Sequence, residues 1–256
     1  MAHQPDALAV ATQNRADEEK RRVALAAAAL VSDGMVVGLG SGSTAALAVG
    51  AIGQRIRDFG LHIVGVSTSS ATSQLAIREG IPLVTTTVPT RVDLTIDGAD
   101  EVDPAMRLIK GGGGCLLREK IVASVSTRLV IVVDSRKWVG HLGETFALPV
   151  EVVPLAWPVV QDRLARLGGD VRLRLAKGGG SQAGPFVTDE GNYILDVSLG
   201  PMLHPEELGA QISQIPGVVE HGMFLNMATD VITARGEEIE HIQRETITGV
   251  TGTTVI

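Results

Sequence analysis

The chain has 256 residues, of which 45% are apolar and 20% charged, a composition typical of a folded protein with a hydrophobic core. A net charge of −7 and an aromatic content of 3% argue against a dedicated nucleic-acid binder, which needs a basic surface and stacking side chains. The single cysteine, Cys115, excludes an intramolecular disulfide and favours a reducing compartment, so we expect a cytoplasmic protein.

The first half of the chain predicts an alternation of strands and helices. Residues 1–15 are expected to form a frayed tail before an alanine-rich helix over Val23–Val31, which is too short to span a membrane. Acidic residues ahead of that run argue against a signal peptide. The further predicted elements are strands at Met35–Leu39, His62–Ser67, Leu83–Thr86, Val92–Ile96 and Leu129–Val133, and helices ending near Arg57 and covering Ser69–Glu79 and Gly113–Ser126. This order is typical of a Rossmann-like α/β domain, a parallel sheet covered on both faces.

The second half changes character after Pro149. Its predicted strands are Val150–Val153, Val171–Leu175, Tyr193–Val197 and Val218–Phe224, with helices at Pro158–Leu167 and Pro205–Gln214 and a glycine-rich loop at Lys177–Gly184. This order predicts a smaller α+β domain of the split-βαβ, ferredoxin-like type over residues 149–225. The β-rich segments Val231–Ala234 and Thr246–Ile256 are expected to return to the first sheet. The first domain would then comprise residues 16–148 and 226–256, with the second inserted into it.

Four segments concentrate glycine, hydroxyl and charged residues, and each is expected to follow a strand of the parallel sheet. They are Gly40–Thr44, Asp97–Asp100, Lys110–Glu119 and Asp134–Lys137. Because ligands of such sheets bind at the carboxyl ends of the strands, we expect the four segments to form one site.

Gly40–Thr44 links a predicted strand to a predicted helix, so its backbone N–H groups could bind an anion. A dinucleotide fingerprint is disfavoured because Ser43 replaces its third glycine and no acidic residue ends the next strand. The alternative is a tight turn in which Ser43 caps the helix.

Asp97 ends a buried strand, where a carboxylate needs a partner. The alternative for the acidic segment is a solvated turn in which Asp100 caps a helix. A magnesium site is disfavoured by the neighbouring lysine.

In the next segment, Lys110 precedes four consecutive glycines that suit backbone binding of a small polar ligand, and Glu119 follows on a helix. An ordinary surface charge is the alternative for Glu119.

Arg136 and Lys137 follow the last apolar strand of the first half and would suit a phosphate, although a solvated loop is the alternative.

No metal site is predicted, because none of the histidines pairs at the spacing of zinc ligands. The six histidines, each expected at the surface or as a cap, are His3, His62, His141, His204, His221 and His241. Cys115 is expected to be a small packing residue rather than a nucleophile.

These motifs together closely resemble those of type A ribose-5-phosphate isomerases. The matching segments are Gly40–Thr44 (GSGST), Asp97–Asp103 (DGADEVD), Lys110–Cys115 (KGGGGC) with Arg118–Lys120 (REK), and Asp134–Lys137 (DSRK). The resemblance runs from about Ala16 to beyond Asp230. It is specific because four motifs occur in order at compatible spacing.

The resemblance implies interconversion of ribose 5-phosphate and ribulose 5-phosphate through a cis-enediolate, a reaction of the non-oxidative pentose phosphate pathway, without cofactor or metal. It makes Glu119 the base, places Asp97 and Asp100 at the sugar hydroxyls and ring oxygen, and gives Lys110 the enediolate charge. The implied substrate-binding residues are Ser41, Gly42, Ser43, Thr44, Gly98, Ala99, Gly111, Gly112, Gly113 and Lys137. Its implied partner is a small-molecule sugar phosphate, with no nucleic acid or membrane, and the expected assembly is a homodimer or homotetramer.

Two alternatives remain open. A non-catalytic sugar-phosphate sensor would share the fold, although no basic recognition helix is evident for a DNA-binding module. An NAD-dependent dehydrogenase is weakened by the missing third glycine. Ketose formation from ribose 5-phosphate without added cofactor would separate these functions.

Overall fold

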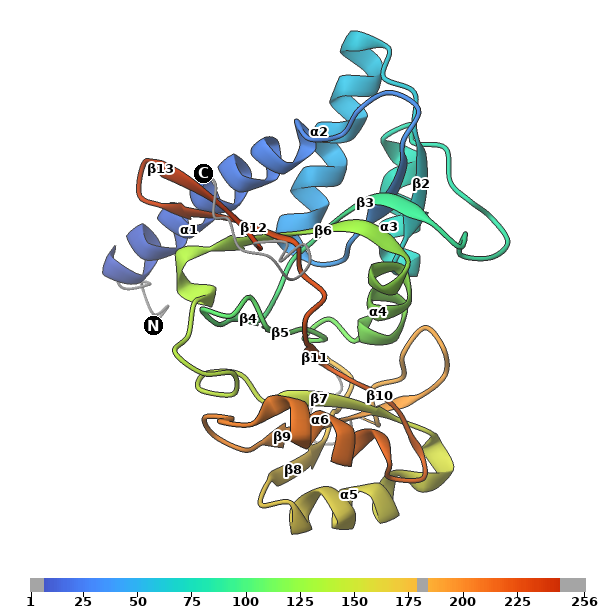
Figure 1. The fold of residues 1–256 in the computed structure, drawn as a ribbon, viewed down its shortest axis with the longest axis vertical. Helices are drawn as coiled ribbons and strands as arrows, with labels where there is room; N and C mark the ends of the chain where they lie inside the picture. The colour runs from blue at the N-terminus through green and yellow to red at the C-terminus, as the bar shows by residue number, and fades with distance from the viewer. Residues whose placement is uncertain (1–6, 179–183, 245–256) are drawn as a thin grey trace, which may run out of the picture.

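The computed structural model describes residues 7–178 and 184–244, which form three sheets and six α-helices (Figure 1). The helices are α1 (Ala7–Ala28), α2 (Ser43–Phe59), α3 (Ser70–Arg78), α4 (Leu116–Ser124), α5 (Trp157–Arg166) and α6 (Pro205–Ser213), with 3-10 turns η1 (Ser135–Lys137) and η2 (Pro154–Ala156). The strands are β1 (Val36–Leu39), β2 (Val64–Ser67), β3 (Val92–Asp97), β4 (Glu101–Val102), β5 (Leu108–Ile109), β6 (Ser126–Asp134), β7 (Leu148–Val152), β8 (Asp170–Leu173), β9 (Tyr193–Ser198), β10 (Val218–His221), β11 (Met223–Phe224), β12 (Asp230–Arg235) and β13 (Glu238–Gln243). Within the described ranges, no helix is both long enough and apolar enough to cross a bilayer.

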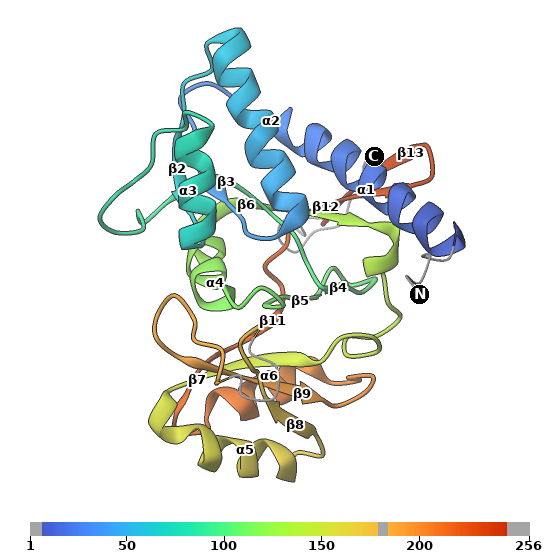
Figure 2. The same cartoon turned by 180° about the vertical axis from the view of Figure 1, so that it is seen from behind.

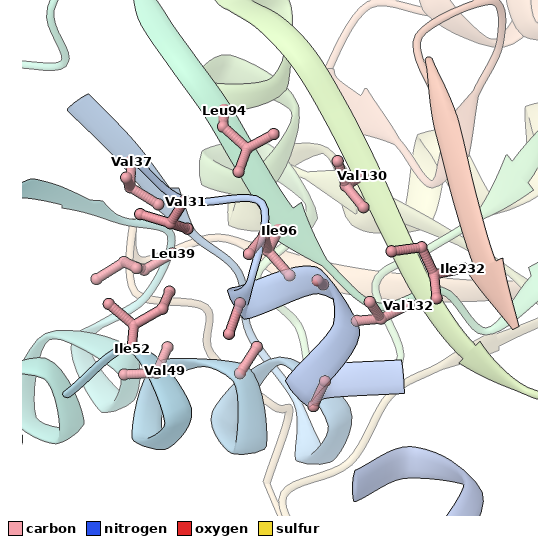
Figure 3. Packing of buried hydrophobic residues seen from close by; sticks show 14 of the residues in the cluster. Val31, Val37, Leu39, Val49, Ile52, Leu94, Ile96, Val130, Val132 and Ile232 are labelled. Carbon is pink, nitrogen blue, oxygen red and sulfur yellow. The ribbon is translucent and has the colours of Figure 1, made fainter. Parts of the chain in front are cut away.

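The largest sheet has six strands in the order β13-β12-β6-β3-β1-β2, all parallel except β13. Alternate residues of its strands face opposite sides. One side packs against α1 and α2, and Figure 3 shows Leu94, Ile96, Val130 and Val132 gathered there with Val49 and Ile52 of α2. The other side, which includes Leu129, Ile131 and Val133, packs against the β4–β5 region, β11 and α4. The predicted α/β class with a sheet covered on both faces is therefore confirmed.

A smaller sheet has the antiparallel order β10-β7-β9-β8 and carries α5 and α6. Numbered along the chain, this is the order 4-1-3-2 of a split-βαβ unit, as the sequence predicted. Figures 1 and 2 show it at the opposite end of the molecule from α1 and α2, with the short sheet β11-β5-β4 and α4 between the two larger sheets. The domain boundaries near residues 148 and 226 stay a prediction.

The strand order places a switch point beside β1. This strand pairs with β2 on one side and with β3 on the other, so the connections after β1 and β3 diverge. Ligands of open α/β sheets bind where such connections separate. The segments after β1 and β3 are Gly40–Thr44 and Asp97–Asp100, two of the four that the sequence indicated.

The structure corrects several predicted elements. Part of the expected N-terminal tail is helical, because α1 begins at Ala7. Leu83–Thr86 forms no strand but a single bridge from Leu83 to Gly65, at the outer edge of β2. Strands β4, β5 and β13 were not predicted, since they are short or highly charged. Thr246–Ile256 and residues 179–183 of the predicted loop lie outside the described residues.

The predicted strand Val218–Phe224 divides at Gly222 into β10 and β11, which belong to different sheets. Gly222 donates its N–H to Pro149 O (2.7 Å) and accepts from Lys110 N (2.8 Å). A Cβ at this position would lie 2.3 Å from the Lys110 carbonyl oxygen, so only glycine permits this close approach. Gly222 therefore connects the small sheet to the backbone of a candidate site residue.

Candidate active site

A cavity of about 120 Å³ opens where β1 and β3 end. It is lined by Ser41, Gly42, Ser43, Thr44, Gly98, Ala99, Asp100, Lys110, Gly111, Gly112, Gly113, Glu119 and Lys137. Asp97 lies beside this wall, with its Oδ2 3.0 Å from Lys110 Nζ. The structure thus brings together all the residues that the sequence indicated for substrate binding and catalysis.

Lys110 reaches the cavity by a route that the sequence did not reveal. It follows β5 of the short antiparallel sheet, and not a strand of the parallel sheet as expected. Strand β4 starts at Glu101, directly after the Asp97–Asp100 turn, and pairs with β5. The chain therefore folds back so that Asp100 N donates to Ile109 O at 2.8 Å, and Lys110 returns to Asp97.

The amino group of Lys110 lies between two carboxyl groups. Its Nζ is 3.0 Å from Asp97 Oδ2 and 3.3 Å from Glu119 Oε2, and it donates to Gly98 O at 2.6 Å. Burial by itself would lower the pKa of Lys110, but the charges of Asp97 and Glu119 outweigh it and hold that pKa above its usual value. Lys110 is therefore a fixed positive charge, only 3% exposed, at the wall of the cavity.

Asp97 and Glu119 are both buried, but they have different hydrogen-bond partners. Asp97 Oδ1 accepts from Ser41 N (3.1 Å) and Gly98 N (2.8 Å), in addition to the contact of Oδ2 with Lys110. Glu119 Oε2 accepts no hydrogen bond from the described residues, and its contact with Lys110 is an ion pair at 3.3 Å. Burial, and secondarily the charge of Asp97, raises the pKa of Glu119 to about 8. Burial also raises the pKa of Asp97, against the opposing effects of Lys110 and the two amides. Because three donors stabilise the Asp97 carboxylate, Glu119 is the member of the pair that binds a proton near neutral pH.

The glycine run forms the side of the cavity next to Asp100. Gly112 N donates to Asp100 Oδ2 at 2.8 Å. A Cβ on Gly112 would lie 2.7 Å from Asp100 Oδ1, and Gly111 has a φ of +108°, which a side chain would strain. The run is therefore glycine because its backbone approaches a carboxylate closely and turns through a left-handed conformation.

The cavity also contains a part that is suited to an anion. Helix α2 starts there, with Gly42 at its N-cap (φ +96°) and with Ser43 and Thr44 in its first turn. The unpaired N–H groups at a helix start attract negative charge. Lys137 also lines the cavity. The alternative in which Ser43 caps the helix is wrong, because the chain turns at Gly42 instead.

A buried glutamate in α1 holds the turn that carries Lys137. Glu19 Oε2 accepts from Ser135 N (3.1 Å) and from Ser135 Oγ (2.8 Å). The neighbouring Arg136 folds back onto Asp134, with Nε–Oδ1 at 2.8 Å, and does not line the cavity. The sequence missed Glu19, since in a run of charged helical residues nothing marks the one that is buried.

Ser41 lines the cavity, but its hydroxyl group belongs to a cluster of hydroxyls behind it. Ser41 Oγ lies 2.8 Å from both Thr68 Oγ1 and Ser69 Oγ, and 3.2 Å from Thr72 Oγ1. The three partners come from the end of β2 and the start of α3, which the sequence did not connect with the site. This cluster fixes the Ser41 backbone, whose N–H contacts Asp97.

Other acidic residues near the site have structural roles. Glu101 accepts from the backbone N–H groups of Gly143, Thr145 and Phe146. The Asp103 carboxylate accepts hydrogen bonds from the backbone N–H and the guanidinium Nε of Arg107. The described residues contain no group of three or more His, Cys, Asp or Glu side chains arranged to hold a metal ion.

The structure contradicts the prediction for His221 and gives a reason for the low reactivity predicted for Cys115. His221 was expected at the surface or as a cap, but it is buried, and burial lowers its pKa to about 4. Its Nδ1 accepts from Met223 N at 3.3 Å, so it links β10 to β11. Cys115 precedes α4, and burial raises the pKa of its thiol to about 11, so it is protonated and a poor nucleophile.

Together, the fold and this site define an α/β protein with a cavity of paired carboxyl groups and a buried lysine at the carboxyl ends of its parallel strands. The family model described as "Ribose 5-phosphate isomerase A (phosphoriboisomerase A)" matches residues 64–238. The chain is 52% identical over 222 residues to ribose-5-phosphate isomerase A of Sphingopyxis alaskensis, covering 87% of this chain and 94% of the relative. It is 50% identical over 227 residues to that of Chloroflexus aurantiacus, covering 88% and 93%.

Solved structures agree with these relatives. Ribose 5-phosphate isomerase A from Methanocaldococcus jannaschii superposes with a TM-score of 0.84 at 42% identity, covering 89% of this chain and 99% of the other. A D-ribose-5-phosphate isomerase in complex with phospho-erythronic acid gives a TM-score of 0.85 at 35% identity, covering 90% and 99%. The chain belongs to the ribose 5-phosphate isomerase A family.

Proposed function

We propose that this chain interconverts D-ribose 5-phosphate and D-ribulose 5-phosphate, with Glu119 as the base that moves a proton between C2 and C1. The observation that carries the proposal is the cluster at the cavity wall. The buried carboxyl group of Glu119 has a pKa of about 8, and its Oε2 lies 3.3 Å from the fixed ammonium group of Lys110 without accepting a hydrogen bond from any described residue. A general base with a pKa near the working pH and a charge beside it suits formation of an enediolate.

The proton transfers follow from this geometry. Glu119 takes the proton from C2 of the open-chain aldose, the C1–C2 double bond forms, and the carbonyl oxygen on C1 becomes an oxyanion. Lys110 stabilises that oxyanion through its charge. The protonated Glu119 then gives its proton to C1, while the C2 hydroxyl proton passes to the oxygen on C1, leaving a ketone at C2. Asp97 and Asp100 contact the sugar hydroxyls and the ring oxygen and assist ring opening.

The start of α2 and Lys137 would bind the phosphate. The start of α2 offers backbone N–H groups and the Ser43 and Thr44 hydroxyls, and Lys137 adds a positive charge. Phospho-erythronic acid, the ligand of one structural relative, is itself a phosphorylated sugar acid. That ligand supports a site for a phosphorylated polyol in this chain.

The test is a direct assay. Purified protein is mixed with ribose 5-phosphate in the presence of a chelator and without nicotinamide cofactor, and ketose formation is followed. The proposal predicts turnover under these conditions. Binding of ribose 5-phosphate without ketose formation would instead favour the sensor function, and a strict requirement for NAD would favour a dehydrogenase.

Replacement of Lys137 tests whether that residue binds the phosphate. We expect Lys137→Ala to raise KM and to leave kcat within about threefold, because a contact made equally in the ground and transition states contributes uniform binding. The loss in kcat/KM should be about ten- to a hundredfold, as for a charge-assisted hydrogen bond. Arg136→Ala is the matched control and should change KM little, since its side chain contacts Asp134. A sharp fall in kcat at unchanged KM would instead place Lys137 at the reacting carbons.

The pH dependence follows from the raised pKa of Glu119, which is about 8. The base must be ionised, so kcat/KM should fall about tenfold per pH unit below that pKa. Lys110 stays protonated throughout this range, because its pKa is raised above its usual value. Asp97→Asn should move the acid limb to lower pH in the residual activity, because the charge of Asp97 is one cause of the raised pKa. A limb that stays near the ordinary glutamate pKa in the unmodified protein would contradict this assignment.

A further inference from the structure

The glycine run is held from its far side by an arginine of the small sheet. Arg174 lies just after β8, and its Nη1 donates to Gly111 O at 2.8 Å and to Gly112 O at 3.3 Å. These two carbonyls belong to the peptide groups whose nitrogens are those of Gly112 and Gly113. One guanidinium group therefore contacts two successive peptide groups of the cavity wall.

Arg174 is itself fixed in place. Its Nε donates to Asp196 Oδ2 at 2.9 Å, and Nη2 contacts Asp196 Oδ1, so the pair is bidentate. The guanidinium also lies 5.9 Å from the centre of the Phe186 ring, and the side chain is only 14% exposed. A bidentate pair with an aromatic contact restricts the guanidinium to one orientation.

The orientation of a trans peptide transmits this contact to the site. The C=O and N–H of one peptide group point in opposite directions. With Gly111 O held by Arg174, the N–H of Gly112 points to the other side, where it donates to Asp100 Oδ2 at 2.8 Å. The interactions thus run from Asp196 through Arg174 and one peptide group to Asp100.

Phe146 and Phe186 pack close to Gly112 and Gly114, but the glycine run also borders open space on the Arg174 side. A second cavity, of about 810 Å³, lies against Gly112 and Gly113 there and is lined also by Arg174, Phe186 and Asp196. Glycine has no side chain to restrict its backbone, so hydrogen bonds add to this packing in fixing the position of a glycine run beside a cavity.

We infer that Arg174 is a positioning residue: it fixes the Gly111–Gly112 peptide group so that Asp100 and the glycine amides face the substrate. The inference rests on the proposed function for its kinetic consequence, because Asp100 contacts the sugar there. Its structural part, the position of the glycine run, holds for any ligand of this cavity. The small sheet thereby acts as a support for the site at the end of the large one.

Arg172 provides a matched control. It lies in β8, two residues before Arg174, and lines the same 810 Å³ cavity. Its side chain is 80% exposed and pairs with Asp170, and it has no hydrogen bond to the glycine run among those described. Replacement of either arginine removes one positive charge from the same strand region, but only Arg174 contacts the glycine run.

The experiment measures kinetics and amide hydrogen exchange in the full chain. For Arg174→Ala we expect kcat with ribose 5-phosphate to fall about ten- to a hundredfold, with KM changing less than threefold. Exchange of the Gly112 and Gly113 amides should accelerate at least tenfold, while that of β6 stays unchanged. Arg174→Lys keeps the charge but lacks the planar fork, so it should restore less than half of the loss. Arg172→Ala should stay within twofold in both readouts.

A double variant tests the connection to Asp196. If Asp196 acts through Arg174, Asp196→Asn combined with Arg174→Ala should lower kcat no further than Arg174→Ala alone. The inference is overturned if Arg174→Ala leaves kcat and glycine-run exchange within twofold, or if exchange accelerates throughout the protein, which would show a loss of global stability. If the unmodified chain does not turn over ribose 5-phosphate, the proposed function fails, and amide exchange still decides whether Arg174 positions the run.

Discussion

Glu119→Gln should lower kcat for ribose 5-phosphate by at least about a thousandfold, because loss of a general base removes roughly 10²–10⁴ of rate and this base serves both proton transfers. Glutamine has the same size and leaves Lys110 in place. Substrate binding should therefore survive, with KM within a few-fold. Steady-state kinetics with calorimetric titration of ribose 5-phosphate would measure both effects.

Glu151→Gln is the control for this change. Glu151 is also buried, its Oε2 also lacks a hydrogen-bond partner among the described residues, and burial raises its pKa as well. Its other oxygen accepts from Thr188 and Asn192, and it does not line the 120 Å³ cavity. Activity of Glu151→Gln should stay within about twofold. Near-normal turnover by Glu119→Gln would show that another group is the base.

Lys110→Met should have the second largest effect, acting on both catalysis and stability. Loss of a charge that stabilises a developing oxyanion should lower kcat about 10²–10³-fold. The change also leaves Asp97 and Glu119 together without their buried cation, and breaking a buried ion pair costs about 3–5 kcal/mol of unfolding free energy. Lys110 lowers the pKa of Glu119, so the acid limb of the remaining activity should move to higher pH. Kinetics over a pH series and urea unfolding would measure these changes.

Lys120→Met separates stability from catalysis. Lys120 is also largely buried, pairs with Glu220 at 2.8 Å and lies 4.9 Å from the Phe224 ring, which Lys110 approaches at 5.4 Å. The Lys120→Met variant should lose stability but keep kcat within about threefold, since Lys120 does not line the cavity. Equal losses of kcat in the two lysine variants would mean that Lys110 acts only through the fold.

Much of the fold follows from local patterns that the sequence displays openly. Leu129–Val133 is apolar at every position because β6 is covered on both sides, and that pattern alone indicates a central strand. Short strands such as β4 and β5 lack such a pattern, since two residues show no period. Their pairing depends on the chain folding back from Asp97 to Lys110, a contact that only the tertiary structure reveals.

The site divides in the same way. Its cavity residues occur in glycine-rich and charged segments with an unusual composition, so they could be predicted from the sequence. The residues that hold these segments in place have no such composition around them. Glu19 looks like any charged residue of a helix, and Arg174 like any charged residue of an exposed strand. What distinguishes them is burial and a partner far away in the chain, such as Ser135 for Glu19 and Gly111 for Arg174.

The transfer of a proton by Glu119 can be measured directly by isomerising ribose 5-phosphate in heavy water and analysing the product by NMR. A base that exchanges its proton with solvent before returning it should place deuterium on C1 of ribulose 5-phosphate. We expect the unmodified chain to incorporate this deuterium, and Glu119→Gln to lose incorporation and turnover together. A ketose formed without any solvent hydrogen at C1, at equal rates by both proteins, would contradict this expectation.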